Sequence, residues 1–220
     1  MDRLLPAVVA CAEAFDDPPD EPCFPGEEDL IAGAVPGRRR EFITARRCAR
    51  DALGRLGHPP APIRPGPKRE PLWPDGVVGS ITHCAGYRAA AVARTAEVAS
   101  VGIDAETHDP LPEGVYGLVA VPDERPMLDD LAAADNGVHW GRLLFSAKES
   151  VYKAWYPLTG RWLGFEEARL TIDRAAGVFT ASILVDGARA DAGPPLRVMA
   201  GRYLVRDGLV LTAVSVPVAG

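Results

Sequence analysis

The sequence predicts an α+β fold, on two observations. Apolar residues recur at helical spacing over residues 38–57 and again over 145–158. Each of these segments is followed by runs that alternate every second residue, as half-buried strands do. The order is therefore helix and strands, then helix and strands again. This order fits one domain of 220 residues made of two related halves, about 1–110 and 111–220.

The first half begins with an acidic, proline-bearing stretch, residues 16–29, which predicts a surface loop. Helical material follows over 27–57, broken near Pro36 and ended by Gly57 and the prolines behind it. Residues 58–76 contain too much Pro and Gly for regular structure, so we expect an extended loop. Three strands are then predicted, at residues 77–83, 87–94 and 98–106.

The second half starts with a long connection, Thr107 to Gly137, rich in acids and turn residues. We expect the helix over 145–158 to end at Pro157, because proline has no N–H to continue it. The remainder predicts a run of strands with glycine-centred turns, at residues 168–173, 177–187, 196–208 and 209–218.

Composition places the chain among soluble globular proteins, with 47% apolar and 25% charged residues. No apolar run approaches the roughly 20 residues needed to cross a bilayer, so we expect no membrane partner. The first 17 residues contain only a short apolar run that leads directly into acids, and we interpret them as part of the mature fold. Four scattered cysteines without a C-x-x-C pair indicate free thiols and a cytoplasmic setting.

Charge is unevenly distributed along the chain. The net charge of −6 argues against nucleic-acid binding, which normally shows a basic face. Residues 13–29 carry eight acids and no base, whereas residues 38–55 carry seven arginines and two acids. An acidic protein with one concentrated basic segment suits a small polyanionic ligand better than a long one.

Two carboxylates, Asp104 and Glu106, share one side of the strand over 98–106, because strand side chains alternate. Two interpretations remain open. The pair is either a solvent-facing acidic edge or part of a site for a hard cation such as Mg²⁺, with Gly102 clearing space beside Asp104.

The segment "FSAKESVYKAWYPL", residues 145–158, holds two of the chain's three lysines, Lys148 and Lys153; the third is Lys68. Glu149 has ordinary explanations. It completes an S-x-x-E capping box with Ser146, and it forms an i,i+4 pair with Lys153 worth about 0.2–0.5 kcal/mol when exposed.

Neither explanation accounts for the two lysines. Aromatic residues flank them, which predicts a partly buried surface that faces a cleft. Lysine presents a compact ammonium that suits phosphate as a point charge, whereas arginine prefers planar partners. The sequence therefore predicts that Lys148 and Lys153 bind phosphate beside a metal-binding carboxylate.

Thr82 and His83 end the first predicted strand, before a glycine turn. A structural role for His83 and a role in binding phosphate are both open. The chain contains no Walker A motif, no G-x-G-x-x-G and no G-x-S-x-G nucleophile elbow.

Taken together, these residues resemble the signature of the 4′-phosphopantetheinyl transferases, G-[IV]-D followed by [FW]-[SCT]-x-K-E-[SA]-x-x-K. Gly102-Ile103-Asp104 and the segment from Phe145 to Lys153 fit it without a gap. "RRREFITARRCARDAL", "THCAGYR" and "RWLGF" are similar to the enterobactin-synthesis and actinobacterial branch of the surfactin-synthetase-activating type. The match runs from about Arg38 to the last strand.

The resemblance implies two similar α+β halves, related by a pseudo-two-fold axis, around a central coenzyme A cleft. It implies transfer of phosphopantetheine from coenzyme A to a serine of an apo acyl or peptidyl carrier protein, by a monomer. The residues that it assigns are Asp104, Glu106 and Glu149 to Mg²⁺, with Glu149 also the proton acceptor; Lys148 and Lys153 to the diphosphate and the transferring phosphate; and Arg38, Arg46 and His83, with Thr82 beside them, to the 3′-phosphate of coenzyme A.

The sequence departs from this pattern at Pro65, where relatives have a lysine. Arg64 and Lys68 are the candidates to replace its diphosphate contact. We also expect the carrier to dock on residues 112–131, steered by arginines such as Arg88 and Arg125. The apolar side chains of this segment either form the docking strip or fill the core beneath a long loop, and both interpretations remain open; they are Val115, Tyr116, Leu118 and Val119.

Two other classes of function remain. One is a different Mg²⁺-dependent enzyme, a phosphatase or a nuclease, although nucleases of the D…E-x-K type place lysine two residues after the glutamate. The other is a catalytically silent module that binds carrier proteins, which the full set of carboxylates and lysines argues against.

Overall fold

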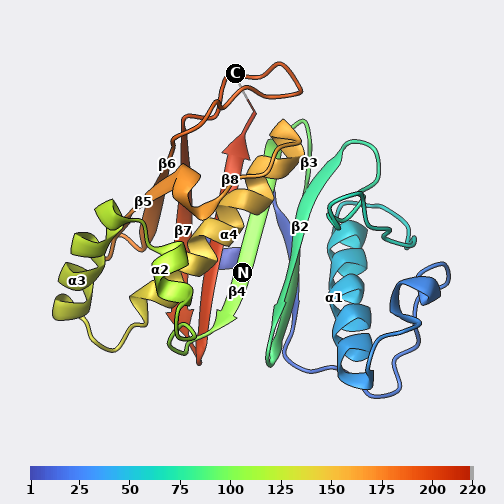
Figure 1. The fold of residues 1–220 in the computed structure, drawn as a ribbon. Coiled ribbons are helices and arrows are strands. Elements are labelled where there is room, and N and C mark those ends of the chain that lie inside the picture. Colours follow the sequence, from blue (N-terminus) through green and yellow to red (C-terminus); the bar gives the residue numbers. More distant parts are fainter. Residues whose placement is uncertain (219–220) are drawn as a thin grey trace.

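The computed structural model describes residues 1–218 and confirms the α+β class (Figure 1). Within these residues the strands form two antiparallel sheets, one of three strands and one of five. A 20-residue helix covers one face of each sheet: α1 (Pro36–Arg55) on the first sheet and α4 (Trp140–Thr159) on the second.

The first sheet has the order β1-β3-β2. Its strands are β1 (Ala10–Ala14), β2 (Val77–Cys84) and β3 (Tyr87–Arg94). One face packs on α1, where Cys48, Ala49 and Leu53 meet Ala90 and Val92 of β3. The small residues of β3 allow close packing on both of its faces. One face packs on α1, and the other packs on residues of β4 and β8.

The second sheet has the order β4-β8-β7-β6-β5. Its strands are β4 (Val98–Thr107), β5 (Ala168–Asp173), β6 (Val178–Ile183), β7 (Val198–Arg206) and β8 (Leu209–Pro217). Helix α4 buries Leu143, Leu144, Val151 and Trp155 against this sheet. Its apolar residues recur every three or four positions, which is the spacing of one helix face.

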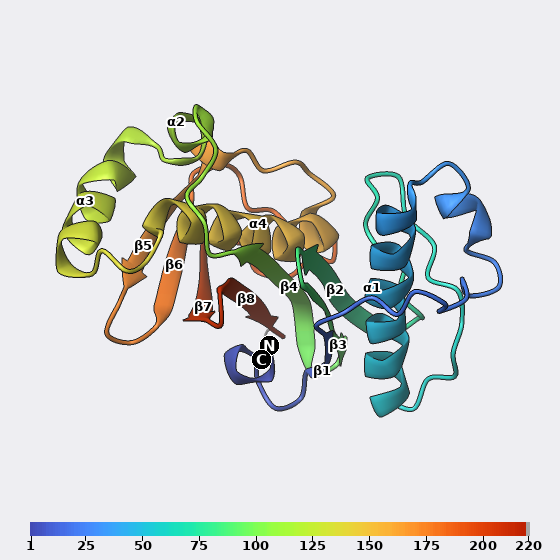
Figure 2. The same cartoon turned by 90° about the horizontal axis from the view of Figure 1, so that it is seen from below.

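The two sheets meet where β2 lies beside β4 (Figures 1 and 2). No backbone ladder joins these two strands. Instead, the backbone N–H of Ile103 donates to Ser80 Oγ at 3.2 Å, and that of Ala105 donates to Thr82 Oγ1 at 3.0 Å. Hydroxyl side chains of β2 therefore satisfy the edge of β4.

Shorter elements complete the described chain. They are the 3₁₀ turns η1 (Asp2–Leu4), η2 (Glu28–Ile31), η3 (Pro122–Glu124) and η4 (Phe165–Glu167), and the helices α2 (Val115–Val119) and α3 (Arg125–Ala134). No helix within residues 1–218 combines the length and the apolar character needed to span a membrane.

Several sequence predictions were wrong in detail. The short strand β1 was not predicted, and neither were α2 and α3, which lie in the connection 107–137. Helix α4 starts at Trp140, so Ser146 is not its cap; the Ser146 hydroxyl is buried and shares a hydrogen bond of 2.9 Å with Thr212.

Helix α4 also continues through Pro157 to Thr159. The proline removes a single backbone hydrogen bond close to the helix end. There the Gly160 N–H bonds to Tyr156 O at 2.8 Å, and Gly160 adopts the left-handed conformation that ends the helix, with a φ of 65°. One lost bond next to such a cap does not break the last turn.

Candidate active site

Asp104 lies near the end of β4 and is only 5% exposed. Its Oδ1 accepts a hydrogen bond from Lys153 Nζ at 2.7 Å and one from the Thr82 hydroxyl at 3.4 Å. Its Oδ2 is buried and has no hydrogen-bond partner among the described residues. Because a buried polar atom without a partner is costly, this oxygen is one that a cation can satisfy.

Gly102, two residues earlier on the same side of β4, sets the distance to α4. A Cβ built on Gly102 would lie 2.0 Å from Ser150 O and 2.6 Å from Ala154 N. The space that Gly102 clears is therefore filled by the backbone of α4, not left for a cation. This close approach brings Glu149 and Lys153 of α4 to Asp104.

Glu106 and Glu149 complete a group of three acidic residues around this point, and both are half-buried. Burial is the main cause that raises the pKa of each carboxyl, and the Asp104 charge raises both further. Lys153 lowers the pKa of both. Glu106 also accepts a hydrogen bond from Arg142 Nη1 at 3.0 Å.

A cavity of about 510 Å³ opens beside these residues. Its walls are β2, the loop Lys68–Trp73 and the second half of α4, which contributes Glu149, Tyr152, Lys153 and Tyr156. The Lys153 side chain is 27% exposed, and its ammonium donates to Ile103 O at 3.1 Å as well as to Asp104. A partly exposed cation and a carboxylate, Lys153 and Glu149, thus line one cavity, as the aromatic flanks in the sequence predicted.

Lys148 occupies a different environment. Its side chain is 2% exposed, and its ammonium donates three hydrogen bonds: to Val119 O at 2.9 Å, to Glu124 Oε2 at 2.8 Å and to Phe165 O at 2.7 Å. An ammonium has three donors, so none is left for a phosphate. In this arrangement Lys148 ties α4 to the turns η3 and η4, and its expected phosphate contact would require one of these bonds to break.

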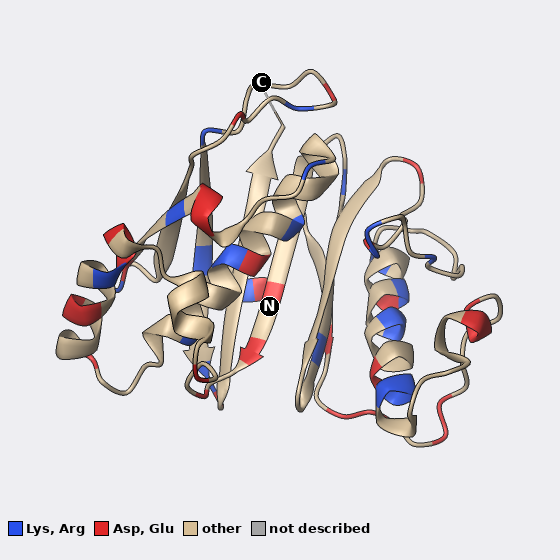
Figure 3. Ribbon diagram, in the orientation of Figure 1, with Lys and Arg blue, Asp and Glu red and all other residues tan. Residues whose placement is uncertain are grey.

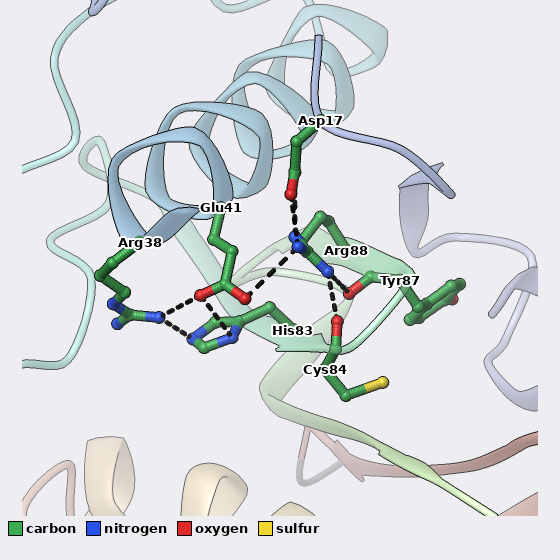
Figure 4. Close-up of polar contacts among 7 residues, drawn as sticks. All are labelled: Asp17, Arg38, Glu41, His83, Cys84, Tyr87 and Arg88. Carbon is green, nitrogen blue, oxygen red and sulfur yellow. Dashed lines mark hydrogen bonds and ion pairs between the residues drawn. The ribbon is translucent and has the colours of Figure 1, made fainter. Parts of the chain in front are cut away.

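His83 and Arg38 come together, whereas Thr82 does not join them. Arg38 Nη1 donates to His83 Nε2 at 2.8 Å (Figure 4). Arg46, two turns further along α1, lies 3.6 Å from the centre of the Phe42 ring, and burial lowers its pKa to about 10. Because side chains alternate along β2, the Thr82 hydroxyl points the other way, toward Asp104.

The acidic loop before the basic helix neutralises part of its charge. Arg47 pairs with Glu21 at 2.7 Å, and Arg50 pairs with the buried Glu27 at 2.9 Å. The basic residues that recur along α1 in Figure 3 are therefore not all available to a ligand. The pairing across the two charged segments was not predicted.

The loop that carries Pro65 separates the two candidate replacements for the missing lysine. Arg64 donates to both carboxylate oxygens of Asp29, at 2.6 and 2.8 Å, on an exposed surface. Lys68 instead lines the cavity, together with Arg69, which adopts a left-handed backbone conformation with a φ of 68°. The geometry favours Lys68 over Arg64 as the replacement for the missing lysine. It also adds Arg69, which the sequence did not single out, as a second basic residue at the cavity.

The donor set around Asp104 matches the chemistry of Mg²⁺, which prefers a few carboxylate oxygens and shares its shell with phosphates. Asp104 provides an oxygen without a partner among the described residues, and its charge is close enough to Glu106 and Glu149 to raise the pKa of both carboxyls. Within residues 1–218, however, no group of three His, Cys, Asp or Glu side chains is arranged to hold a metal. Lys153 and Arg142 pair with the carboxylates in this arrangement.

Sequence reasoning missed two residues that position this site. Arg142 donates to Glu106 and to the carbonyls of Asp109 and Pro110, so it fixes the chain where it leaves β4. It lies seven positions before Glu149, and extending the helical pattern backwards would have found it. Glu124, the partner of Lys148, had no signal, because it is one acid among several in the connection.

Comparisons with known proteins agree with this arrangement. Residues 26–93 match the model of the 4′-phosphopantetheinyl transferase N-terminal domain, and residues 100–192 match that of the 4′-phosphopantetheinyl transferase superfamily.

Similar relatives extend the match to nearly the whole chain. The 4′-phosphopantetheinyl transferase Svp of Streptomyces mobaraensis is 56% identical over 216 residues, 97% of this chain and 87% of the relative. The 4′-phosphopantetheinyl transferase PptT of Mycobacterium tuberculosis is 53% identical over 219 residues, 96% of this chain and 95% of the relative. Enterobactin synthase component D of Salmonella typhimurium is more distant, 33% identical over 196 residues, 85% of this chain and 76% of the relative.

These relatives confirm the resemblance on which the sequence analysis depended, including the link to the enterobactin branch. The chain belongs to the 4′-phosphopantetheinyl transferase family and is an enzyme of that class.

Proposed function

We propose that the chain transfers phosphopantetheine from coenzyme A to a serine of apo acyl or peptidyl carrier proteins, at the cavity between β2 and α4. The observation that carries this proposal is the contact of Lys153 with Asp104 at the wall of that cavity, next to Glu149. A flexible ammonium, a carboxylate oxygen without a partner and a second carboxylate are the groups that phosphoryl transfer needs.

Asp104, Glu106 and Glu149 would hold Mg²⁺. When bound, Mg²⁺ supplies charge neutralisation to the diphosphate. Lys153 has a partly exposed ammonium, so it can leave Asp104 for a diphosphate oxygen. Lys68, on the opposite wall, would contact the same diphosphate.

The serine Oγ forms a bond to the phosphorus next to the pantetheine. The bond from that phosphorus to the bridging oxygen breaks and releases adenosine 3′,5′-bisphosphate. Glu149 would take the serine proton, and its raised pKa, caused mainly by burial, accords with that task. Thr82 would orient Asp104 through its hydroxyl rather than bind coenzyme A.

Arg38, Arg46 and His83 would bind the 3′-phosphate of coenzyme A. The contact of Arg38 with His83 supports this, whereas Arg46 lies further along α1, over the Phe42 ring and with its Nε donating to Ile63 O at 3.1 Å. A central coenzyme A cleft between halves 1–110 and 111–220, related by a pseudo-two-fold axis, is part of the proposal. It is supported by one 20-residue helix on each antiparallel sheet, although β4, which belongs to the first half of the chain, lies in the second sheet.

The carrier would dock on α2, in the segment between the two signature motifs. Tyr116 and Leu118 are 38% and 73% exposed there, whereas Val119 is buried in the core and cannot contribute. The expected steering by Arg88 is excluded because Arg88 is only 5% exposed; Arg125 remains at the surface.

The test is to incubate the protein with coenzyme A, Mg²⁺ and an apo carrier, and to weigh the carrier. We expect the added mass of phosphopantetheine with the unmodified chain and none with Glu149→Gln. Glu97→Gln, which changes an exposed acid in the turn between β3 and β4, is the matched control and should retain full transfer. Full transfer by Glu149→Gln would overturn the assignment of Glu149.

A further inference from the structure

Arg88 of β3 is a buried arginine that is enclosed by acceptors (Figure 4). Its Nε and Nη2 form a fork with the two oxygens of Asp17, at 3.1 and 2.5 Å. Its Nη1 donates to the carbonyls of Cys84 and Tyr87, the latter at 2.8 Å. Only 5% exposed, Arg88 cannot reach a bound ligand.

The sheet register explains why Arg88 lies next to His83 and Arg38, two of the residues proposed to bind the 3′-phosphate. Strands β2 and β3 form a hairpin around Ala85 and Gly86, and Gly86 has the positive φ, 72°, that a tight turn requires. His83 pairs directly with Arg88 in this hairpin, so both side chains leave the sheet on one face. That face is covered by the first turns of α1, where Arg38 and Glu41 lie.

Glu41 connects Arg88 to the ligand-binding candidates. Its Oε1 lies 3.4 Å from Arg88 Nη2, and its Oε2 accepts from Arg38 Nη1 at 3.1 Å. The same Oε2 lies 3.9 Å from His83 Nδ1. Because Arg38 donates to His83 Nε2, the proton of the neutral ring is on Nδ1 and faces Glu41.

Charge also favours a fixed Glu41. Asp17 neutralises Arg88 through a two-point fork. The remaining contact of Arg88 with Glu41 therefore constrains Glu41, while the Glu41 charge stays available to Arg38 and His83. The Arg38 side chain is 50% exposed, and a long exposed side chain would otherwise sample many rotamers. Glu41 contacts one nitrogen of Arg38 and leaves its other donors free.

We propose that Arg88 and Glu41 are positioning residues for the 3′-phosphate of coenzyme A: Arg88 holds Glu41, and Glu41 orients Arg38 and His83 before the phosphate arrives. This inference rests on the proposed role of Arg38 and His83. It adds that the "GYR" arginine and an acid of the arginine-rich helix act through their neighbours. Preorganised groups bind more tightly because less freedom is lost on binding.

The experiment compares KM for coenzyme A with KM for 3′-dephospho-coenzyme A, at one fixed carrier concentration. For Glu41→Ala we expect KM for coenzyme A to rise about tenfold, as for the loss of one charge-assisted contact, and KM for the dephospho form to change by less than about twofold. Arg88→Gln should show the same split. Arg88→Lys, which keeps the charge but not the fork, should fall between Arg88→Gln and the unmodified chain.

Arg202→Gln, on an exposed position of β7, is the matched control and should change neither KM. Asp17→Asn loosens Arg88 more gently and serves if Arg88→Gln does not fold. Equal rises of both KM values would show a merely structural role and overturn the inference. So would a lower KM for coenzyme A in Glu41→Ala, because Glu41 would then compete with the phosphate.

The unmodified chain separates this inference from its premise. If it does not distinguish the two coenzymes, the 3′-phosphate assignment fails and the positioning role fails with it. If it does distinguish them and Glu41→Ala distinguishes them equally well, the premise stands and only the positioning role is wrong.

Discussion

The two sides of α4 use the same residue type for opposite purposes. On the closed side, Lys148 is enclosed by Val119, Glu124 and Phe165, and all three of its donors are occupied. On the open side, Lys153 faces the cavity, touches Asp104 and Ile103, and keeps a quarter of its side chain exposed. A signature motif therefore mixes residues that build the site with residues that act in it.

The two lysine–carboxylate pairs differ in how freely their members can separate. Glu124 is 1% exposed and also accepts backbone N–H groups from Val121 and Leu170, so it cannot move to solvent with Lys148. Lys153 can reach water or a ligand by rotating. The closed pair is part of the fold, and the open pair is available for exchange.

The largest effect should come from the open side. Asp104→Ala removes the carboxylate around which Lys153, Thr82 and the proposed Mg²⁺ ligands gather. We expect kcat/KM for coenzyme A to fall by on the order of 10³, measured by the mass of the carrier at saturating Mg²⁺. The thermal midpoint should stay near that of the unmodified chain. Near-normal turnover at limiting Mg²⁺ would contradict the assignment.

A second test replaces each of the two lysines by methionine, in separate variants. Lys148→Met leaves Glu124 buried without its cation, so the free energy of unfolding should fall by about 3–5 kcal/mol. Lys153→Met should cost less, about 1–3 kcal/mol, because the Lys153 side chain is 27% exposed although its partner Asp104 is buried.

Denaturant unfolding of both variants, with transfer rates at a temperature where both are folded, provides the measurement. Adding Glu124→Gln to Lys148→Met should recover part of the lost stability. If Lys148→Met were stable and inactive, Lys148 would belong to the open side.

A third test measures how the affinity for coenzyme A depends on pH through the titration of His83. Burial first, and then the Arg38 charge, lower the pKa of His83 below its usual 6.5; Glu41 raises it, and Lys153 and Arg88 lower it further. A bound phosphate would raise this pKa, so binding takes up a proton. Affinity for coenzyme A should therefore increase as pH falls from the pKa of His83 in the phosphate-bound protein to its lower pKa in the free protein.

Calorimetry from about pH 8 to about pH 5.5 can detect this proton uptake. The phosphate itself titrates near pH 6, and His83→Gln corrects for that contribution because it keeps the phosphate and removes the ring. An unchanged pH dependence in His83→Gln would exclude His83 from the phosphate contact.

The smallest effect should come from the loop that carries Pro65. Lys68→Ala should raise KM for coenzyme A and for its dephospho form alike, by about three- to fivefold, because both contain the diphosphate. Arg64→Ala should change either value by less than about twofold, because Arg64 is paired with Asp29 away from the cavity. The reverse order would move the diphosphate contact to Arg64.

The sequence predicted the elements with strong periodicity and missed those without it. The alternation in 98–106 and the helical spacing in 38–57 are long enough to identify β4 and α1. Strand β1, "ACAEA", is short and rich in alanine, so nothing in its composition favours a strand.

The site shows the same limit in another form. Residue type and spacing predicted that Asp104, Glu149 and Lys153 meet, because the chemistry needs those groups together. They did not predict the direction of Lys148 or Thr82, which depends on packing across α4 and across β2. Spacing along a chain defines a face, but which neighbour occupies that face is a tertiary property.

Gly102 has a mechanical consequence for the whole site. At Gly102 the backbone of α4 lies directly on that of β4, with no β4 side chain between them. We therefore expect α4 and β4 to move together as one rigid unit. Adjustment to substrates of different size therefore falls to the other wall of the cavity, β2 and the loop Lys68–Trp73, where hydroxyl-to-backbone bonds instead of a ladder form the joint.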